Sequence, residues 1–404
     1  MFKKKLLASW ALALVLFTGQ GCQQESLTTP ATTPVPEKDY LVSAQLVGEL
    51  PQSILKAMAD SRGYADIKSD IKYDVQVYQV TYLTTYKEQE IQASGLLAVP
   101  KNAPEALPIL SGHHGTTFEQ QDAPTNFPAT FTGFELFASA GYLTVIPDYI
   151  GYGISKQIFH PYYDQKHSAL AVIDLVKAAK SYAQKNSLKL NDKLFLVGYS
   201  EGGYVTMAAQ KEIETHPEHQ LKVTAAAAGA GGFDLTGMLS EIAANKPYSK
   251  PSYLAFILQS YIKTYSWNRP LSDFFQEPYA SQVPVLFNGV ASAGTINRSL
   301  STDPAKLFNQ TFYTNLKTTD GELALKKALV NNTIYTNWTP ASPTKIYQGT
   351  QDESVFFQNS KTTYEKLKAA GAKNLEFIPI QNGTHSSSIG PMMMSVIPWF
   401  KSLK

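Results

Sequence analysis

The stretch LFLVGYSEGGYVTMAAQ, residues 194–210, decides the fold. Five largely apolar residues lead into a Gly-x-Ser-x-Gly pattern, and a segment of helix-forming composition follows directly. Between a strand and a helix, this pattern places the serine on a sharp turn that lifts its hydroxyl clear of the sheet. Gly198, Gly202 and Gly203 let neighbouring backbone approach that turn. The pattern therefore predicts a nucleophilic Ser200, and the alternative is a structural turn that contains a serine.

Strand-like and helix-like segments alternate on both sides of this stretch. The expected strands cover 107–112, 143–149, 193–200, 222–231, 344–350 and 374–380, and the expected helices cover 132–142, 163–186, 201–216, 354–371 and 388–403. Two β-branched and aromatic runs, 73–86 and 90–100, precede them and suit an antiparallel hairpin. This alternation predicts an α/β protein with a mostly parallel central sheet and helices on both faces, which is compatible with an α/β-hydrolase fold.

Residues 235–340 break the alternation. The segment holds many aromatic side chains and the apolar run SYLAFILQSYI. We expect it to be an inserted helical cap over the strand ends, with most of its aromatic side chains packed internally and some facing the site. With this insertion, residues 40–404 form one α/β-hydrolase domain.

A serine nucleophile needs a base, and the base needs an acid to orient it. In an α/β-hydrolase the two follow the serine in the order acid, then histidine. Of the seven histidines, His385 alone follows the late strands, in the polar stretch QNGTHSSS. We predict Asp352 as the acid, because it comes directly after the strand 344–350, with Glu353 as the alternative. Asp234 is a weaker alternative and is more typical of a residue that fixes a turn.

Acyl transfer also requires donors for the oxyanion. We expect one to be the backbone N–H of Glu201, directly after the serine, and the other to be the N–H of Thr116 in the stretch HHGTT. Gly115 is expected to allow a sharp turn there. His113 and His114 have no carboxylate or cysteine beside them at ligand spacing, so we interpret them as supports of this loop rather than as a metal site. The mechanism requires no metal or organic cofactor.

The N-terminus is typical of an exported protein. MFKKK is a basic start, LLASWALALVLF is an apolar core too short to span a bilayer comfortably, and TGQGCQQE resembles the cleavage region of a bacterial lipoprotein. Residues 1–22 are therefore a predicted signal peptide, and Cys22, the single cysteine, is a predicted lipid attachment point. The alternative is a chance cysteine. Residues 23–39, rich in Thr and Pro, read as a tether to a bacterial membrane, facing the periplasm or the cell surface.

The charge balance excludes one class of partner. The chain has 404 residues and a formal net charge of +2, with 35 basic and 33 acidic residues. Without the three lysines of the predicted signal peptide, the 35 basic residues fall to 32 against 33 acidic ones. This nearly neutral balance leaves no excess of positive charge that would bind nucleic acid. No later segment is long enough to span a membrane, and nothing indicates an obligate protein partner.

Four motifs occur in an order that resembles the secretory lipase family of α/β-hydrolases: HHGTT, PDYIGYG, HPYYDQKHSALAVIDLVKAAK and GYSEGG. The resemblance spans about residues 73–234 and resumes from about 343 to the end. It implies a serine esterase or lipase with a helical cap inserted before the acid. It also implies a triad of Ser200, Asp352 and His385.

The sequence therefore predicts an exported serine hydrolase that cleaves a small-molecule or lipid carboxylic ester through an acyl-enzyme. One alternative is a peptidase or an acyltransferase that uses the same triad. Another is a non-catalytic surface binding protein on a hydrolase scaffold. The presence of all three triad residues in order argues against the second alternative. The aromatic, weakly charged composition of 235–340 favours esters over peptides.

Overall fold

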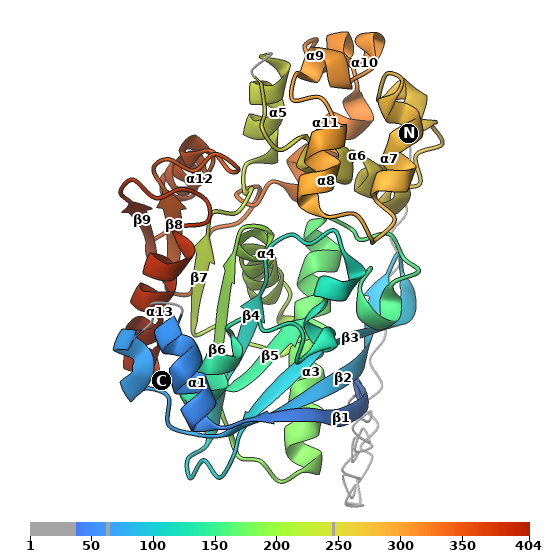
Figure 1. Ribbon diagram of the computed structural model, residues 1–404. Coiled ribbons are helices and arrows are strands. Elements are labelled where there is room, and N and C mark those ends of the chain that lie inside the picture. The colour runs from blue at the N-terminus through green and yellow to red at the C-terminus, as the bar shows by residue number, and fades with distance from the viewer. Residues whose placement is uncertain (1–37, 62–64, 245–246) are drawn as a thin grey trace, which may run out of the picture. The chain divides into compact units, whose positions relative to one another are not determined.

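The computed structural model describes residues 38–61, 65–244 and 247–404. The predicted signal peptide, Cys22 and all but the last two residues of the predicted tether lie outside these ranges. Among the described residues, nine strands form one sheet in the order β1-β2-β3-β5-β4-β6-β7-β8-β9 (Figure 1). Their bounds are β1 Leu41–Leu50, β2 Val75–Tyr86, β3 Gln89–Pro100, β4 Leu107–His113, β5 Leu143–Pro147, β6 Leu190–Tyr199, β7 Ala225–Gly229, β8 Thr344–Gly349 and β9 Leu375–Ile380.

The sheet is parallel over most of its width. The pairings β5–β4, β4–β6, β6–β7, β7–β8 and β8–β9 are parallel, whereas β1–β2, β2–β3 and β3–β5 are antiparallel. The prediction of a mostly parallel sheet in an α/β-hydrolase fold is confirmed. The sequence pattern does not predict β1 or α1 (Gln52–Ser61).

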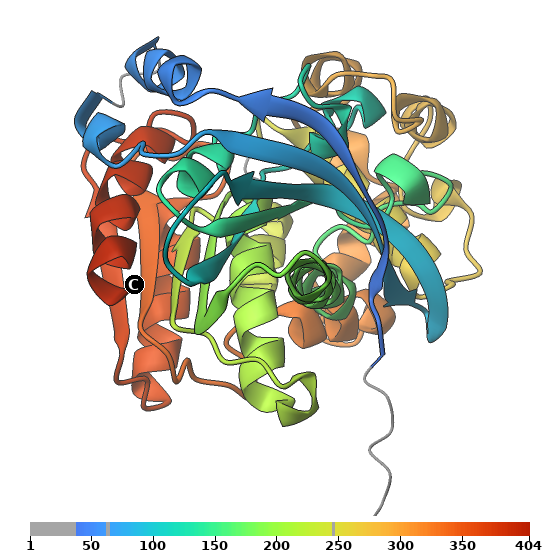
Figure 2. The same ribbon diagram turned by 90° about the horizontal axis from the view of Figure 1, so that it is seen from below.

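Helices cover both faces of the sheet (Figure 2). One apolar core lies between the sheet and the helices α3, α4 and α12, and a second lies between the sheet and α1, α2 and α13. Successive residues of β6 alternate between the two cores, with Leu196 in the first and Val197 in the second. This is the two-residue period of a strand buried on both faces. The helix bounds are α2 Glu135–Ser139, α3 Gln165–Lys185, α4 Glu201–Thr215, α12 Phe357–Ala369 and α13 Ile389–Leu403.

A helical segment, residues 235–332, lies between β7 and β8. It is gathered at one end of the sheet (Figure 1). Its helices are α5 Leu235–Ala243, α6 Pro251–Thr264, α7 Tyr279–Leu286, α8 Ala293–Ser299, α9 Pro304–Leu307, α10 Gln310–Leu316 and α11 Leu323–Asn332. Within the described ranges, no helix is both long enough and apolar enough to cross a bilayer.

Hydrogen bonds fasten the helical segment to the loop that precedes α3. The Tyr265 hydroxyl donates to Asp164 Oδ2 at 2.6 Å and accepts from Asn332 Nδ2 at 2.7 Å. The Tyr261 hydroxyl donates to the Tyr163 carbonyl at 3.0 Å. Because Asp164 also caps the N-terminus of α3, one carboxylate joins the helical segment to the sheet-covering helices.

The β2–β3 hairpin turn suggests a stabilising substitution. Lys87 and Glu88 both have positive φ, 49° and 60°, a conformation that disfavours residues with a Cβ. Glu88→Gly should raise the free energy of unfolding by roughly 0.5–1 kcal/mol, because glycine adopts this φ without strain. Thermal unfolding checks this as a small rise in Tm. Gln89→Gly, at the extended first residue of β3, is the control and should lower Tm. A lower Tm for both variants would contradict the prediction.

Candidate active site

Ser200 occupies a strained turn between β6 and α4. Its φ and ψ are 60° and −126°, a region sparsely populated by residues with a side chain. Its backbone N–H donates to the Gly229 carbonyl at 2.8 Å, which fastens the turn to the end of β7. The strand before, the helix after and the positive φ together form the sharp strand-to-helix turn that Gly-x-Ser-x-Gly predicts.

The glycines around Ser200 are required by space. A Cβ on Gly198 would lie 2.1 Å from the Gly202 carbonyl oxygen, and a Cβ on Gly202 would lie 1.9 Å from the His113 carbonyl oxygen. A Cβ on Gly203 would lie 2.3 Å from the Gly229 carbonyl oxygen. All three distances are shorter than any contact that a Cβ tolerates. The first turn of α4 can therefore approach both β7 and the loop after β4 only with glycine at these positions.

Ser200, His385 and Asp352 form a continuous chain of hydrogen bonds. His385 Nε2 lies 3.0 Å from Ser200 Oγ, and His385 Nδ1 lies 2.8 Å from Asp352 Oδ2. A carboxylate that accepts from Nδ1–H leaves the Nε2 lone pair directed at the serine hydroxyl. The chain can therefore move a proton from Ser200 to His385 while the imidazole keeps its orientation.

Asp352 is held in place by donors from its own loop. Its Oδ1 accepts the backbone N–H groups of Ser354 and Val355, each at 2.9 Å. Its Oδ2 accepts Gln348 Nε2 at 2.9 Å in addition to the His385 ring. The Asp352 side chain is fully buried, so these donors replace the water that an exposed carboxylate would bind.

The two alternative acids have other contacts. Glu353 Oε2 accepts the backbone N–H of His385 at 3.1 Å rather than a ring nitrogen. Asp234 caps α5, where its Oδ1 accepts the N–H of Gly237 at 2.8 Å. On the opposite side of His385, the Tyr199 hydroxyl donates to the His385 carbonyl at 2.6 Å. Glu353 and Tyr199 therefore hold the backbone of His385, a pair of contacts that sequence reasoning missed.

The predicted oxyanion donors belong to segments that meet at Ser200. Glu201 is the first residue of α4, so its N–H has no acceptor within the helix. Gly115 lies against the serine, because a Cβ built on it would be 3.4 Å from Ser200 Cβ. Thr116 follows, and its Oγ1 lies 3.0 Å from the Tyr162 hydroxyl. Gly115 does not adopt the positive φ that the expected sharp turn would use.

His113 is buried and joins the end of β4 to α4. Its Nδ1 lies 2.7 Å from Thr206 Oγ1, and its Nε2 lies 2.9 Å from Ser111 Oγ. Because the Thr206 hydroxyl already donates to the Gly202 carbonyl, it must accept from Nδ1–H, which fixes one neutral tautomer. Burial lowers the pKa of His113 to about 3. His113 is therefore an uncharged residue that supports the loop carrying Thr116.

His114 stacks on Tyr149, with the ring centroids 4.3 Å apart. Its Nδ1 donates to the Gly115 carbonyl at 2.8 Å. In the part of the chain that the structure describes, no group of three or more His, Cys, Asp or Glu side chains is arranged to hold a metal ion.

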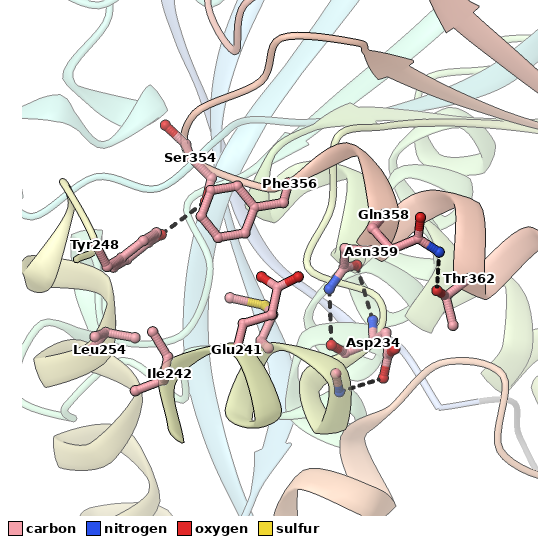
Figure 3. Close-up of a pocket in the computed structure, with 12 residues that line it drawn as sticks. Asp234, Glu241, Ile242, Tyr248, Leu254, Ser354, Phe356, Gln358, Asn359 and Thr362 are labelled. Atoms are coloured by element: carbon pink, nitrogen blue, oxygen red, sulfur yellow. Dashed lines mark hydrogen bonds between the residues drawn. The ribbon is translucent and has the colours of Figure 1, made fainter. Parts of the chain in front are cut away.

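A pocket lies between the acid loop and the helical segment. Figure 3 shows Ile242 and Leu254 on one side of it and Phe356 on the other. The Tyr248 hydroxyl bridges the two sides by donating to the Ser354 carbonyl at 2.8 Å. Ser354, which lines the pocket, lies two residues after Asp352 in the chain, so the pocket adjoins the acid loop.

A second pocket, of about 200 Å³, lies beside His160. Its other lining residues include Phe118, Gln120, Tyr152, Phe256 and Phe287. His160 Nε2 in turn contacts Glu201 Oε1 at 2.7 Å. Sequence reasoning missed this pair, because the two residues lie 41 positions apart, one on the loop before α3 and the other at the start of α4.

The sequence model of the secretory lipase family matches residues 132–402, a range that contains Ser200, Asp352 and His385. The rice cell wall degrading esterase LipA from Xanthomonas oryzae, in a ligand-bound form, superposes with a TM-score of 0.79 at 25% identity, covering 91% of this chain and 98% of LipA. Candida antarctica lipase A has a TM-score of 0.61 at 17% identity, covering 86% of this chain and 78% of the lipase. A comparison with curated proteins gives no match.

The low pKa of His113 makes stability depend on pH. The unfolded chain takes up a proton on His113 near pH 6.5, whereas the folded protein does so only near pH 3. The free energy of unfolding should therefore fall as the pH falls from 6.5 towards 3, by up to about 1.4 kcal/mol per pH unit from this residue. The His113→Gln variant should be less stable at pH 7. Its free energy of unfolding should depend less steeply on pH, by that amount.

Denaturant titrations between pH 7 and pH 4 check the difference in slope. Val197→Ala is the control, because it should lower stability by roughly 1–3 kcal/mol and keep the wild-type slope. A slope for His113→Gln equal to that of the wild type would show that His113 also titrates normally in the fold.

Proposed function

This chain belongs to the secretory lipase family and is a carboxylic-ester hydrolase, and we propose that it uses Ser200, His385 and Asp352 as a Ser-His-Asp triad. The observation that carries the proposal is the hydrogen-bonded chain from Asp352 through the two His385 ring nitrogens to Ser200 Oγ. The family supports ester hydrolysis, and the geometry supports these three residues as the groups that perform it.

In the proposed reaction, Ser200 Oγ attacks the ester carbonyl carbon while His385 Nε2 accepts the hydroxyl proton. Asp352 holds the imidazole in one tautomer and stabilises the imidazolium that forms. The backbone N–H groups of Glu201 and Thr116 donate to the oxyanion of the tetrahedral intermediate. His385 then returns its proton to the leaving alcohol. Water attacks the resulting acyl-enzyme by the same route, and the acid is released.

We propose that residues 235–340, which include this helical segment, form the cap over this site. The contacts between Tyr248 and Ser354 and between Tyr265 and Asp164 support this role, because they join the helical segment to the acid loop and to the loop before α3. The helical segment contributes aromatic and aliphatic side chains to both pockets, Ile242, Tyr248 and Leu254 to one and Phe256 and Phe287 to the other. Such side chains suit the apolar part of an ester. The esterase LipA and lipase A, which share this fold, act on esters as well.

We propose that the protein is exported and anchored to a bacterial membrane by a lipid on Cys22. The secretory character of the family and the predicted signal peptide at residues 1–22 support export. The Thr- and Pro-rich residues 23–39 would separate the catalytic domain from the membrane surface. The substrate would then be an ester that reaches the cell envelope.

Ser200→Ala tests the proposed nucleophile. Removing the hydroxyl should lower kcat for p-nitrophenyl butyrate by at least about 10³-fold, because no group remains to form the acyl-enzyme. The variant should also fail to react with a fluorophosphonate probe. Ser281→Ala, at an exposed position of α7, is the matched control and should behave as the wild type. Undiminished turnover by Ser200→Ala would exclude this mechanism.

Asp352 and Glu353 can be separated by amide substitutions. Asp352→Asn should lower kcat by roughly 10³–10⁴-fold, because the amide favours the wrong imidazole tautomer. Glu353→Gln should lower it only a few-fold, since the amide oxygen still accepts the His385 backbone N–H. Steady-state kinetics on the same ester compare the two variants. Equal losses would contradict the assignment of Asp352 as the orienting acid.

A further inference from the structure

A buried carboxylate–imidazole pair includes Glu201, the residue that follows the proposed nucleophile in the chain. Glu201 Oε1 contacts His160 Nε2 at 2.7 Å, and the two side chains are only 3% and 5% exposed. Glu201 begins α4, and His160 lies on the loop before α3. The proposed mechanism uses only the backbone N–H of Glu201, so the buried side chain has no role in it.

Hydrogen-bond partners fix the number of protons in the pair. His160 Nδ1 lies 2.7 Å from the Ile150 carbonyl, which can only accept, so Nδ1 carries a hydrogen. The contact between Nε2 and Glu201 then requires one further proton, on the ring nitrogen or on the carboxyl group. In either arrangement the two side chains share that proton, and the net charge of the pair is zero.

Apart from His160, the residues around Glu201 offer little to compensate the negative charge of its carboxylate. The side chains around it are aromatic, with ring centroids of Tyr152 and Phe256 at 5.1 Å and 5.8 Å from that of His160. Burial and then the charge of Glu201 raise the pKa of Tyr149 and Tyr152. In the described ranges, His160 is the one basic group within ion-pair distance of Glu201. The titratable groups that face the pair are Tyr149, Tyr152, Tyr162, Tyr163 and Tyr253, and Lys156 lines the same pocket as His160.

We propose that the His160–Glu201 pair is a positioning device for the oxyanion hole, one that holds the Glu201 N–H in place and keeps the local charge at zero. This inference rests on the proposed triad and oxyanion hole. The donor N–H and the carboxylate belong to the same residue. A deprotonated, unpaired carboxylate would therefore oppose the negative oxygen of the tetrahedral intermediate in a medium of low dielectric constant. Its effect falls on the transition state, so kcat changes more than KM.

A double-mutant cycle tests this role with p-nitrophenyl butyrate as substrate. His160→Gln leaves the carboxyl group unpaired, so kcat should fall about 100-fold at pH 9, with KM within about threefold of the wild type. Glu201→Gln keeps an N–H donor for His160 and should lower kcat only about threefold to tenfold. The double variant lacks the charge altogether and should recover at least about tenfold over His160→Gln.

The double variant separates charge compensation from packing. His160→Gln keeps the carboxyl group without its partner, whereas the double variant replaces both side chains and disturbs the packing at least as much. Recovery of kcat in the double variant therefore reports on charge. A double variant no better than His160→Gln would overturn the proposal.

The matched control is His167→Gln, on α3. His167 Nδ1 contacts Asp164 Oδ1 at 2.7 Å, and the two side chains are buried, with 9% and 5% of their surface exposed. This variant should lower Tm but leave kcat and its pH profile unchanged. If His160→Gln does not fold, the wild type and Glu201→Gln decide: the positioning role requires Glu201→Gln to lose kcat at an unchanged KM, and an unchanged kcat or a raised KM would overturn it.

Ser200→Ala, measured in the same series, separates the two proposals. Residual turnover in that variant would overturn the triad itself. An inactive Ser200→Ala together with additive His160 and Glu201 variants would overturn only the role of the pair.

Discussion

Four backbone segments meet so closely at Ser200 that a single methyl group would not fit between them. The start of α4 touches the end of β6, the end of β7 and the loop after β4, and Gly198, Gly202 and Gly203 are the residues that make these contacts. The close approach forces Ser200 into a conformation with positive φ. It also brings the N-terminus of α4 and the loop of Thr116 to the same point. The rest of the site is arranged around this turn: the acid follows β8, the base follows β9, and the Tyr248–Ser354 hydrogen bond joins the helical segment to the acid loop.

Three buried or half-buried histidines meet different needs in this arrangement. His113 is kept neutral by burial and by two hydroxyl groups, so it can support the loop without introducing charge. His160 shares a proton with Glu201 and so keeps a carboxylate from standing unpaired among aromatic rings. The His385 side chain is 13% exposed, and it is the one that is hydrogen-bonded to Ser200 Oγ. The partner of each imidazole, rather than its mere presence, determines what it can do.

The sequence predicts most of the fold because the buried parallel strands and their helices have strong local patterns. The strand–turn–helix at Ser200 and the order of the late motifs were sufficient to indicate the α/β-hydrolase fold and the family. The sequence pattern does not predict the edge strand β1, because Val42 and Leu46 are almost half exposed and the alternation of apolar and polar residues is weak. The Glu201–His160 pair is missed for another reason, because a contact between the start of a helix and a loop 41 positions away leaves no periodic signal in the chain. The roles of the triad residues stay predictions that the hydrogen-bond geometry favours.

The hydrogen bond from Tyr199 to the His385 carbonyl has a mechanical consequence. Tyr199 is the last residue of β6 and is covalently joined to Ser200, so the nucleophile and the base are both attached to the end of the same strand. A shift of that strand end therefore acts on both residues, on Ser200 through the chain and on His385 through this hydrogen bond. Such coupling reduces the change that the shift makes in their separation of 3.0 Å. Rotation of the imidazole about its own bonds is the motion that can still change it.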